Sequence, residues 1–328
     1  MKRILCAALV LMLVLTTFVG CERAADDGRV EIVCTVFPIY DWVDNLLDES
    51  DDVALRLLVN RGTDPHSYTP TPTDIAAIHA SDVLIYVGGE SDAWVSDVLE
   101  TVKNEDIKVI SLLDLLGDRA HTEETVEGMQ CDDGDCHDHD HEGDDGEEHG
   151  AYDEHVWLSV KNAEILCDAL AEELSEVLPD MADGIEANRA AYSDSLSALD
   201  ARFEEAVAAA SEKLLIFADR FPFRYLVEDY SLDYFAAFSG CSADSEASFE
   251  TVVFLSDKLK ESGAGVLIIL ESSTKDLANT VISNSGCEGV EIVVMDSMQS
   301  ITARDVEAGA SYLLIMEKNL AALSAALG

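Results

Sequence analysis

Short apolar stretches alternate with helix-like stretches in two halves of the chain, and one long helical run separates the halves. In the first half, the expected strands cover residues 32–37, 53–59, 83–87 and 109–110. In the second half, they cover residues 214–217, 233–238, 266–270 and 290–295. Tight hairpin signals are missing between these strands. The alternation therefore favours parallel sheets with helices on their faces.

Residues 180–210 form the long helical run, and the stretch from Glu186 to Ala210 contains neither Gly nor Pro. Its alternating apolar and charged positions suit a helix that packs along one side. We therefore predict an α/β protein of two lobes, each a mostly parallel sheet flanked by helices, joined by one long rigid helix. We expect a leader at residues 1–20 and a tether at 21–29. An N-terminal lobe at 30–178, the connecting helix at 179–211 and a C-terminal lobe at 212–328 would follow.

The first twenty residues have the pattern of an export signal. A short basic start precedes the apolar run 4–15, which is too short for a comfortable membrane span. Residues 18–21, Phe-Val-Gly-Cys, resemble the lipobox at which a bacterial lipoprotein is cut and its cysteine lipidated. Acyl chains on Cys21 would anchor the mature protein to the outer face of a membrane. A secreted protein cut elsewhere and a membrane anchor helix are the alternatives.

The formal net charge of −46 argues against nucleic acid and against anionic substrates, because both would be repelled. It suits a protein that gathers cations, although much of the charge is also what a solubilising surface would carry. Part of it is concentrated in residues 118–152, which are rich in acids, Gly and His and nearly devoid of large apolar side chains. Such a segment cannot bury enough surface to order itself, so we expect a disordered loop.

Metal-binding side chains are concentrated in this loop: Cys131, Cys136, His137, His139, His141 and His149. We interpret the four histidines as an auxiliary site that collects metal weakly, because ordering a flexible loop costs conformational entropy. A disordered spacer that does not collect metal is the alternative. The two cysteines could form a disulfide or bind metal.

Two further histidines bracket the loop. Pro65 pushes Asp64 towards an extended conformation and helps to fix the loop that presents His66. A loop at the carboxyl end of a strand faces the crevice where α/β sheets bind ligands. His155 lies between acidic residues and the apolar start of a helix at Trp157. Neutral imidazole is a common zinc ligand, so we predict that both histidines bind a divalent cation; simple capping or packing is the alternative.

Carboxylates at strand ends are the other candidate ligands. Asp296 directly follows the apolar run 290–295, and its alternative role is a helix cap. Glu271 ends another apolar strand and is a reserve candidate.

These motifs resemble those of the substrate-binding lipoproteins of bacterial zinc and manganese ABC transporters, over about residues 30–327. Residues 62–72, Gly-Thr-Asp-Pro-His-Ser-Tyr-Thr-Pro-Thr-Pro, are similar to that family's first ligand loop. Residues 154–158, Glu-His-Val-Trp-Leu, resemble the second, with Ser-Val following where Asp-Pro is usual. Residues 225–232 resemble the segment after the third ligand, and residues 294–298 the strand end that supplies an Asp.

The resemblance also shows where this chain departs from the family. Relatives place a His or Glu five residues before the tyrosine that matches Tyr225, but here that position is Arg220, whose guanidinium stays protonated and cannot bind a cation. If the preceding strand ends near Phe217, Asp219 would take the ligand position. A structural Asp219–Arg220 pair, with water or another acid on the metal, is the alternative.

The resemblance implies a binding protein without enzymatic activity that captures Zn²⁺ between its lobes and delivers it to an ABC permease. The His- and Cys-rich loop favours zinc, and Mn²⁺ is the alternative ligand. A surface zinc hydrolase is less favoured, since neither a His-Glu-x-x-His helix nor a Gly-x-Ser-x-Gly elbow is present. An adhesin or a metal store without a permease is a third possibility. We expect a monomer.

An oxidising exterior permits a disulfide, and the possible pair to test is Cys241 with Cys287, both in the second half of the chain.

Overall fold

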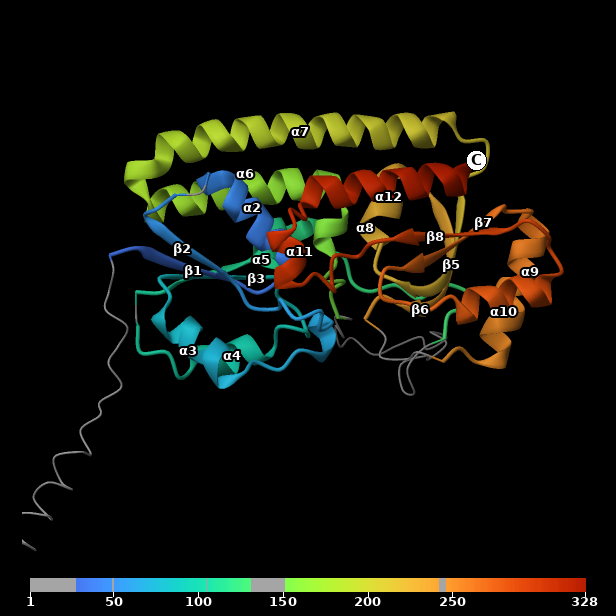
Figure 1. The fold of residues 1–328 in the computed structure, drawn as a ribbon, viewed down its shortest axis with the longest axis horizontal. Helices are drawn as coiled ribbons and strands as arrows, with labels where there is room; N and C mark the ends of the chain where they lie inside the picture. The colour runs from blue at the N-terminus through green and yellow to red at the C-terminus, as the bar shows by residue number, and fades with distance from the viewer. Residues whose placement is uncertain (1–27, 49, 105, 131–150, 242–245) are drawn as a thin grey trace, which may run out of the picture.

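The computed structural model describes residues 28–48, 50–104, 106–130, 151–241 and 246–328, and it contains two four-stranded sheets (Figure 1). The leader with Cys21 lies outside the described residues, and so do Cys131, Cys136 and the four histidines of the expected collecting loop. None of the helices in the described ranges is both long and apolar enough to cross a membrane.

The first sheet has the order β2-β1-β3-β4, and all its pairings are parallel. Its strands are β1 (Val30–Cys34), β2 (Val53–Leu57), β3 (Val83–Tyr86) and β4 (Lys108–Ser111). Ile32 and Cys34 of β1 belong to the main core, whereas Val33 between them packs into a smaller core on the opposite face. Helices cover both faces, which is why the buried part of β1, residues 32–34, is apolar on both sides rather than alternating.

The helices of the first lobe are divided between the two faces of this sheet (Figure 1). The smaller core lies under α3 (Pro72–Ala80) and α4 (Trp94–Leu99). The main core lies under α2 (Phe37–Leu47), α5 (Leu112–Leu116) and α6 (Val160–Val177).

The second sheet repeats this arrangement with the order β6-β5-β7-β8, again fully parallel. Its strands are β5 (Leu214–Phe221), β6 (Asp233–Ser239), β7 (Val266–Leu270) and β8 (Glu291–Met295). The helices that follow β5 in the chain are α8 (Arg224–Tyr230), α9 (Phe249–Ser262), α10 (Asp276–Ser285), α11 (Ala303–Glu307) and α12 (Tyr312–Leu327). Of these, α11 lies beside the first lobe (Figure 1), where the N–H of Ala303 donates to the carbonyl of Asn60. Alternate residues of β5 again face different cores: Phe217 faces the main core and Ile216 the core under α9 and α10.

A single helix, α7 (Ala182–Ala209), runs along both lobes and packs on α6, α2 and α12 (Figure 1). Its 28 residues span about 42 Å. Its buried side chains recur every three to seven residues: Ile185, Tyr192, Leu196, Leu199, Phe203 and Val207. The main core continues beneath it from one sheet to the other. The predicted fold, two parallel α/β lobes joined by one long helix, is confirmed.

The expectation of disorder over residues 118–152 is wrong for the described part of that segment. The backbone N–H of Gln130 donates to the carbonyl of Ala237 on β6 at 2.9 Å. Thr122 forms an isolated bridge with Tyr152. Met129 packs against the main core, which supplies the apolar burial that the composition of the segment as a whole did not suggest.

A buried carboxylate joins three helices of the scaffold. Asp41 of α2 is only 7% exposed. Its Oδ2 accepts hydrogen bonds from the backbone N–H of Tyr312 at 3.0 Å, at the start of α12, and from the hydroxyl of Tyr192 on α7 at 3.4 Å. Burial raises the pKa of Asp41 from 3.8 to about 6, despite these hydrogen bonds.

This raised pKa makes the stability of the fold depend on pH. As pH rises from 3.8 to about 6, the unfolded chain loses the Asp41 proton before the folded one, so the free energy of unfolding falls through this window and is constant above it. Asp41→Asn lacks this titration. Its free energy of unfolding relative to the unchanged protein should therefore rise by about 2 kcal/mol between about pH 4 and pH 7. Urea melts at both pH values measure this difference, and a difference that does not change with pH would contradict it.

Candidate metal centre

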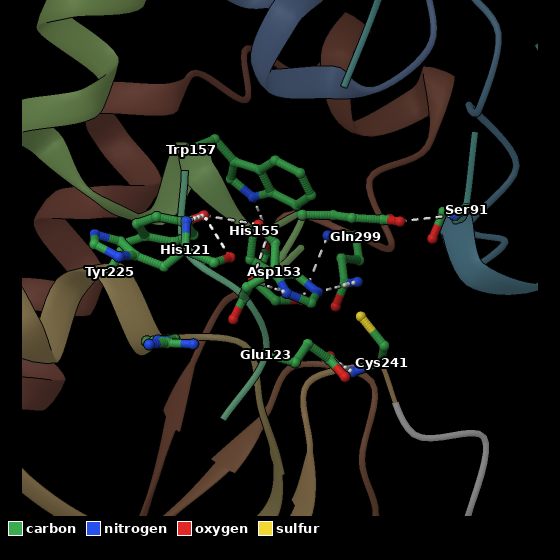
Figure 2. Close-up of polar contacts among 12 residues, drawn as sticks. Ser91, His121, Glu123, Asp153, His155, Trp157, Tyr225, Cys241 and Gln299 are labelled. Atoms are coloured by element: carbon green, nitrogen blue, oxygen red, sulfur yellow. Dashed lines mark hydrogen bonds and ion pairs between the residues drawn. The ribbon is translucent and has the colours of Figure 1, made fainter. Parts of the chain in front are cut away.

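Loops at the carboxyl ends of strands from both sheets meet between the lobes. His66 lies in a 3-10 turn (Pro65–Ser67) after β2, and Ser91 lies after β3. From the second lobe, Cys241 follows β6 and Gln299 follows β8. His155 directly precedes the 3-10 turn Val156–Leu158. Figure 2 shows His155, Gln299 and Cys241 around the same small region. This is the edge at which open α/β sheets bind ligands.

The two predicted histidine ligands lie next to each other although 89 positions separate them. Their Nε2 atoms are 3.2 Å apart. Two nitrogens on one tetrahedral zinc, with Zn–N bonds of about 2.05 Å, are separated by about 3.3 Å. The pair therefore already has nearly the spacing that a shared zinc ion requires.

A thiol completes the donor group. Among the described residues, His66, His155 and Cys241 are the group of three or more His, Cys, Asp or Glu side chains whose donor atoms all lie within 4.8 Å of one another. The N···S separation on a tetrahedral zinc is about 3.6 Å. The Cys241 sulfur is therefore at most about 1.2 Å farther from each nitrogen than a shared zinc ion would place it.

Hydrogen bonds fix the orientation of the His155 ring, which is fully buried. Asp153 Oδ1 accepts from His155 Nδ1 at 2.8 Å and from the His155 backbone N–H at 2.9 Å. With its proton on Nδ1, the ring presents the Nε2 lone pair to His66. A carboxylate behind a ligating imidazole fixes its tautomer and strengthens it as a ligand.

His66 is held from three sides. Asp64 Oδ1 accepts from its backbone N–H at 3.0 Å, and its Nδ1 lies 2.5 Å from the hydroxyl oxygen of Ser91. Glu154 Oε2 lies 3.9 Å from the same Nδ1, and Glu154 Oε1 accepts from the Ser91 N–H at 2.7 Å. Glu154 therefore supports the His66 ring and is not a free base.

The surroundings set the protonation of the donors. Burial and the charge of His155 lower the pKa of His66 to about 4, so its imidazole is neutral and available at neutral pH. Burial alone would lower the pKa of His155, but the charge and hydrogen bond of Asp153 outweigh it and raise that pKa. Burial, followed by the charge of Glu123, raises the pKa of the Cys241 thiol. A cation that binds here must therefore displace a proton from the thiol.

Gln299 lies against both imidazoles. Its side-chain Nε2 is 3.0 Å from His66 Nε2 and 3.0 Å from His155 Nε2. The residue is 5% exposed, and its Oε1 is buried without a hydrogen-bond partner in the described part of the chain.

The structure places Asp219 away from this group, and the physical reason is the length of its strand. β5 does not end near Phe217 but continues to Phe221, with a register shift between Phe217 and Arg220. The Asp219 carboxylate accepts from the N–H of Leu270 at 2.9 Å and from that of Arg220 at 2.8 Å. It therefore stabilises the irregularity in the sheet.

Asp296 and the reserve candidate Glu271 also lie outside the donor group. Asp296 Oδ1 accepts from the N–H of Met298 at 2.8 Å within the loop after β8, and it caps no helix, since α11 begins only at Ala303. Glu271 accepts from the N–H and hydroxyl of Ser297, each at 2.9 Å, and from the hydroxyl of Ser300 at 3.0 Å. Both carboxylates shape the loop that carries Gln299.

The predicted disulfide between Cys241 and Cys287 is not present, since both are free thiols. Cys241 belongs instead to the donor group, and Cys287 packs at the edge of the core under α9 and α10.

Arg220 links the two lobes beside the site. Its guanidinium bonds Asp64 Oδ2 at 2.6 Å, whereas Asp64 Oδ1 holds the His66 backbone. Burial opposes ionisation of Asp64, but Arg220 and His66 outweigh it and lower the pKa of Asp64. Arg220 stands where the resembled family has a ligand. It affects the site indirectly, by fixing the loop that presents His66.

Loss of this link should weaken zinc binding moderately. Arg220→Gln removes the charged partner of Asp64 and leaves the first ligand loop less fixed. Zinc affinity should fall by about three- to tenfold, less than the roughly 10- to 100-fold that loss of a group bonded directly to a ligand costs. Competition with a chromophoric chelator measures this change. Arg189→Gln, which removes an exposed ion pair with Asp168, is the matched control and should leave affinity unchanged.

A two-lobed α/β protein with imidazole and thiol donors gathered between its lobes is a metal-binding protein of the substrate-binding type. The chain belongs to the family described as "Zinc-uptake complex component A periplasmic", whose profile matches residues 32–326. This is a family of substrate-binding transport proteins rather than of enzymes.

Individual relatives agree with this family. The chain is 33% identical over 297 residues to zinc-binding lipoprotein AdcA of Streptococcus pneumoniae, covering 90% of this chain but 56% of that protein. It thus spans little more than half the length of this relative. It is 25% identical over 302 residues to the high-affinity zinc uptake system protein ZnuA of Bacillus subtilis, covering 91% of this chain and 88% of the relative.

Among solved structures, the Zn(II)-bound ZnuA-like domain of S. pneumoniae AdcA matches with a TM-score of 0.69 and 29% identity, over 92% of this chain and 99% of that domain. TroA of Treponema pallidum, at 21% identity, shares the fold with a TM-score of 0.71 over 92% and 100% of the two chains.

Sequence reasoning missed Cys241 and Gln299 as neighbours of the two histidines. Both follow strands, as Asp296 does, so the rule that drew attention to Asp296 applied to them as well. Asp153 and Ser91, which fix the two imidazoles, gave no separate signal in the sequence.

Proposed function

We propose that this protein captures Zn²⁺ outside the cytoplasm in the cleft between its lobes and delivers it to an ABC permease. The observation that carries the proposal is the 3.2 Å separation of His66 Nε2 and His155 Nε2, which matches two ligands of one tetrahedral zinc. Cys241 is the third ligand. Because these donors come from both lobes, the cation would hold the lobes together.

Zinc is favoured over the alternative Mn²⁺ by the kind of donors. Two imidazoles and a thiolate suit zinc, whereas manganese prefers carboxylate, carbonyl and water oxygens. The names of the relatives support the same ion. The His-rich segment with His137, His139, His141 and His149 is proposed to collect zinc weakly and pass it to the cleft.

Delivery requires the protein to be near the membrane. We propose that acyl chains on Cys21 anchor it there, as the lipobox-like residues 18–21 suggest and as the lipoprotein name of a relative supports. The expected partner in the membrane is the permease of a metal ABC transporter, and the binding protein is proposed to act as a monomer.

Metal titration of the mature chain tests the proposal. Equilibrium dialysis against a chelator that strips weak sites should leave one tightly held Zn²⁺ per chain and no tightly held Mn²⁺. The weaker sites of the His-rich segment are removed by the same chelator. Absence of a tight site, or a tight site that takes Mn²⁺ equally well, would exclude zinc capture as stated.

A further inference from the structure

The side-chain amide of Gln299 lies against the two histidine Nε2 atoms that a shared cation would bind. Asp153 holds the His155 proton on Nδ1. We assign the His66 proton to Nδ1 as well, where it points at the Ser91 hydroxyl oxygen 2.5 Å away. Both Nε2 lone pairs are then left without a proton of their own at 3.2 Å from each other. One amide NH₂ group, 3.0 Å from each, satisfies both.

The other end of the same amide is unsatisfied. Gln299 Oε1 is a buried carbonyl oxygen with no hydrogen-bond partner among the residues that the structure describes. Buried polar atoms without partners are rare in folded proteins, and each one needs an explanation. An amide has nearly the same shape in its two orientations, so a half-turn exchanges Oε1 and Nε2 at little steric cost.

The loop that carries Gln299 is built to place this side chain. Met298, directly before it, has φ 61°, a left-handed conformation that costs free energy in a residue with a side chain. Asp296 bonds the Met298 N–H, and Glu271 bonds Ser297 and Ser300. Trp157, two positions after His155, donates from Nε1 to the carbonyl of Ser297 at 2.9 Å. The loop is thus tied to the segment that presents His155.

We propose that the Gln299 NH₂ group bonds both imidazoles from a ligand position when the site holds no cation, and that on capture the amide turns so that Oε1 takes this position as the fourth ligand beside His66, His155 and Cys241. The proposal rests on the proposed zinc-binding function and adds the identity of the closing ligand and the class of cation. Two imidazoles, one thiolate and one amide oxygen form a closed set that favours thiophilic, tetrahedral cations, Zn²⁺ and Cd²⁺, over Mn²⁺.

The distances agree with this assignment. The three atoms His66 Nε2, His155 Nε2 and the Gln299 amide position form a triangle with edges of 3.2, 3.0 and 3.0 Å. One face of a zinc tetrahedron has edges of about 3.3 Å. Three of the four ligand positions therefore need only small adjustments.

Selective labelling observes the turn directly, because the chain contains just two glutamines, Gln130 and Gln299. Gln130 is the internal control, since its amide contacts Ser248 and Glu246 and not the histidines. In protein labelled with ¹⁵N and ¹³C at glutamine side chains, addition of one Zn²⁺ should shift the Gln299 NH₂ and carbonyl signals and leave those of Gln130 in place. If zinc binds tightly and the Gln299 signals do not move, the proposal fails.

Two variants test the ligand set in chelator competitions with Zn²⁺, Cd²⁺ and Mn²⁺. Gln299→Leu removes both the NH₂ group and the ligand oxygen at similar volume, and it should weaken Zn²⁺ binding by about tenfold or more. If Gln299 only covers the empty site, the Gln299→Leu variant should instead bind Zn²⁺ equally tightly or more tightly. Gln130→Leu is the matched control.

Cys241→Ser tests the thiolate. It should remove the ultraviolet thiolate-to-cadmium charge-transfer band and narrow the preference for Zn²⁺ over Mn²⁺ by about tenfold or more. A band that persists would overturn the role of Cys241. Failure of the unchanged protein to bind Zn²⁺ would instead overturn the proposed function, so the two failures are distinguishable.

Discussion

Replacing either His66 or His155 by alanine should abolish tight zinc binding. Each imidazole supplies one of the two nitrogens that stand 3.2 Å apart, and no other described imidazole lies in the donor group. Changes outside the ligand shell of a metal already cost roughly 10- to 100-fold in affinity, so loss of a ligand should cost more than about 100-fold. Chelator competition at constant pH measures the loss for each variant.

The control for these variants is His79→Ala, since His79 lies on α3 and contacts Thr101 rather than the donor group. It should bind zinc like the unchanged protein. His155 is fully buried, so its loss also creates a cavity, and thermal melts must accompany its binding data. His66 is partly exposed, so the His66→Ala variant tests the loss of a ligand with less disturbance of the core. Zinc affinity within threefold of the unchanged protein in His66→Ala would show that the assigned site is wrong.

Asp153→Asn should have the second largest effect, about 10- to 100-fold weaker zinc binding with the ligands themselves intact. The amide keeps an oxygen for the His155 backbone N–H but removes the negative charge that faces His155 Nδ1 at 2.8 Å. The imidazole then becomes a weaker ligand, and its preferred tautomer is less well defined.

Asp168→Asn is the matched control for this substitution. Asp168 is also a carboxylate in an ion pair, but its partner is Arg189 on the surface, where such pairs contribute little. Equal zinc affinities in the Asp153 and Asp168 variants would contradict the orienting role. Titration of the His155 ring by NMR gives a second readout, because loss of the carboxylate should lower its raised pKa.

Most of the architecture was readable from the sequence because it is encoded locally. The strands of both sheets lie within a few residues of the predicted ones, and the helix over 182–209 matches the uninterrupted run that predicted it. β5 is the exception. The apolar pattern ends near Phe217, but Asp219 continues the strand by bonding the backbone of β7, a tertiary contact that no local pattern encodes.

The metal centre was only half predictable. His66 and His155 carry strong local signals, a proline-fixed loop and an acid-flanked imidazole, and the structure brings them together. Cys241 looked like half of a disulfide, and Gln299 looked like an ordinary polar residue. Their roles depend on which loops meet between the lobes, and the mutual placement of the lobes is set by the core shared beneath α7.

The sequence alone thus determined the elements, the order in which strands and helices alternate, and the two imidazoles most suited to a cation. These features follow from residue type and spacing along a short stretch of chain. Asp153 is a local partner, two positions before His155. The other partners were decided by tertiary structure, because Ser91, Cys241 and Gln299 reach the imidazoles across a few ångströms from segments that are far apart along the chain.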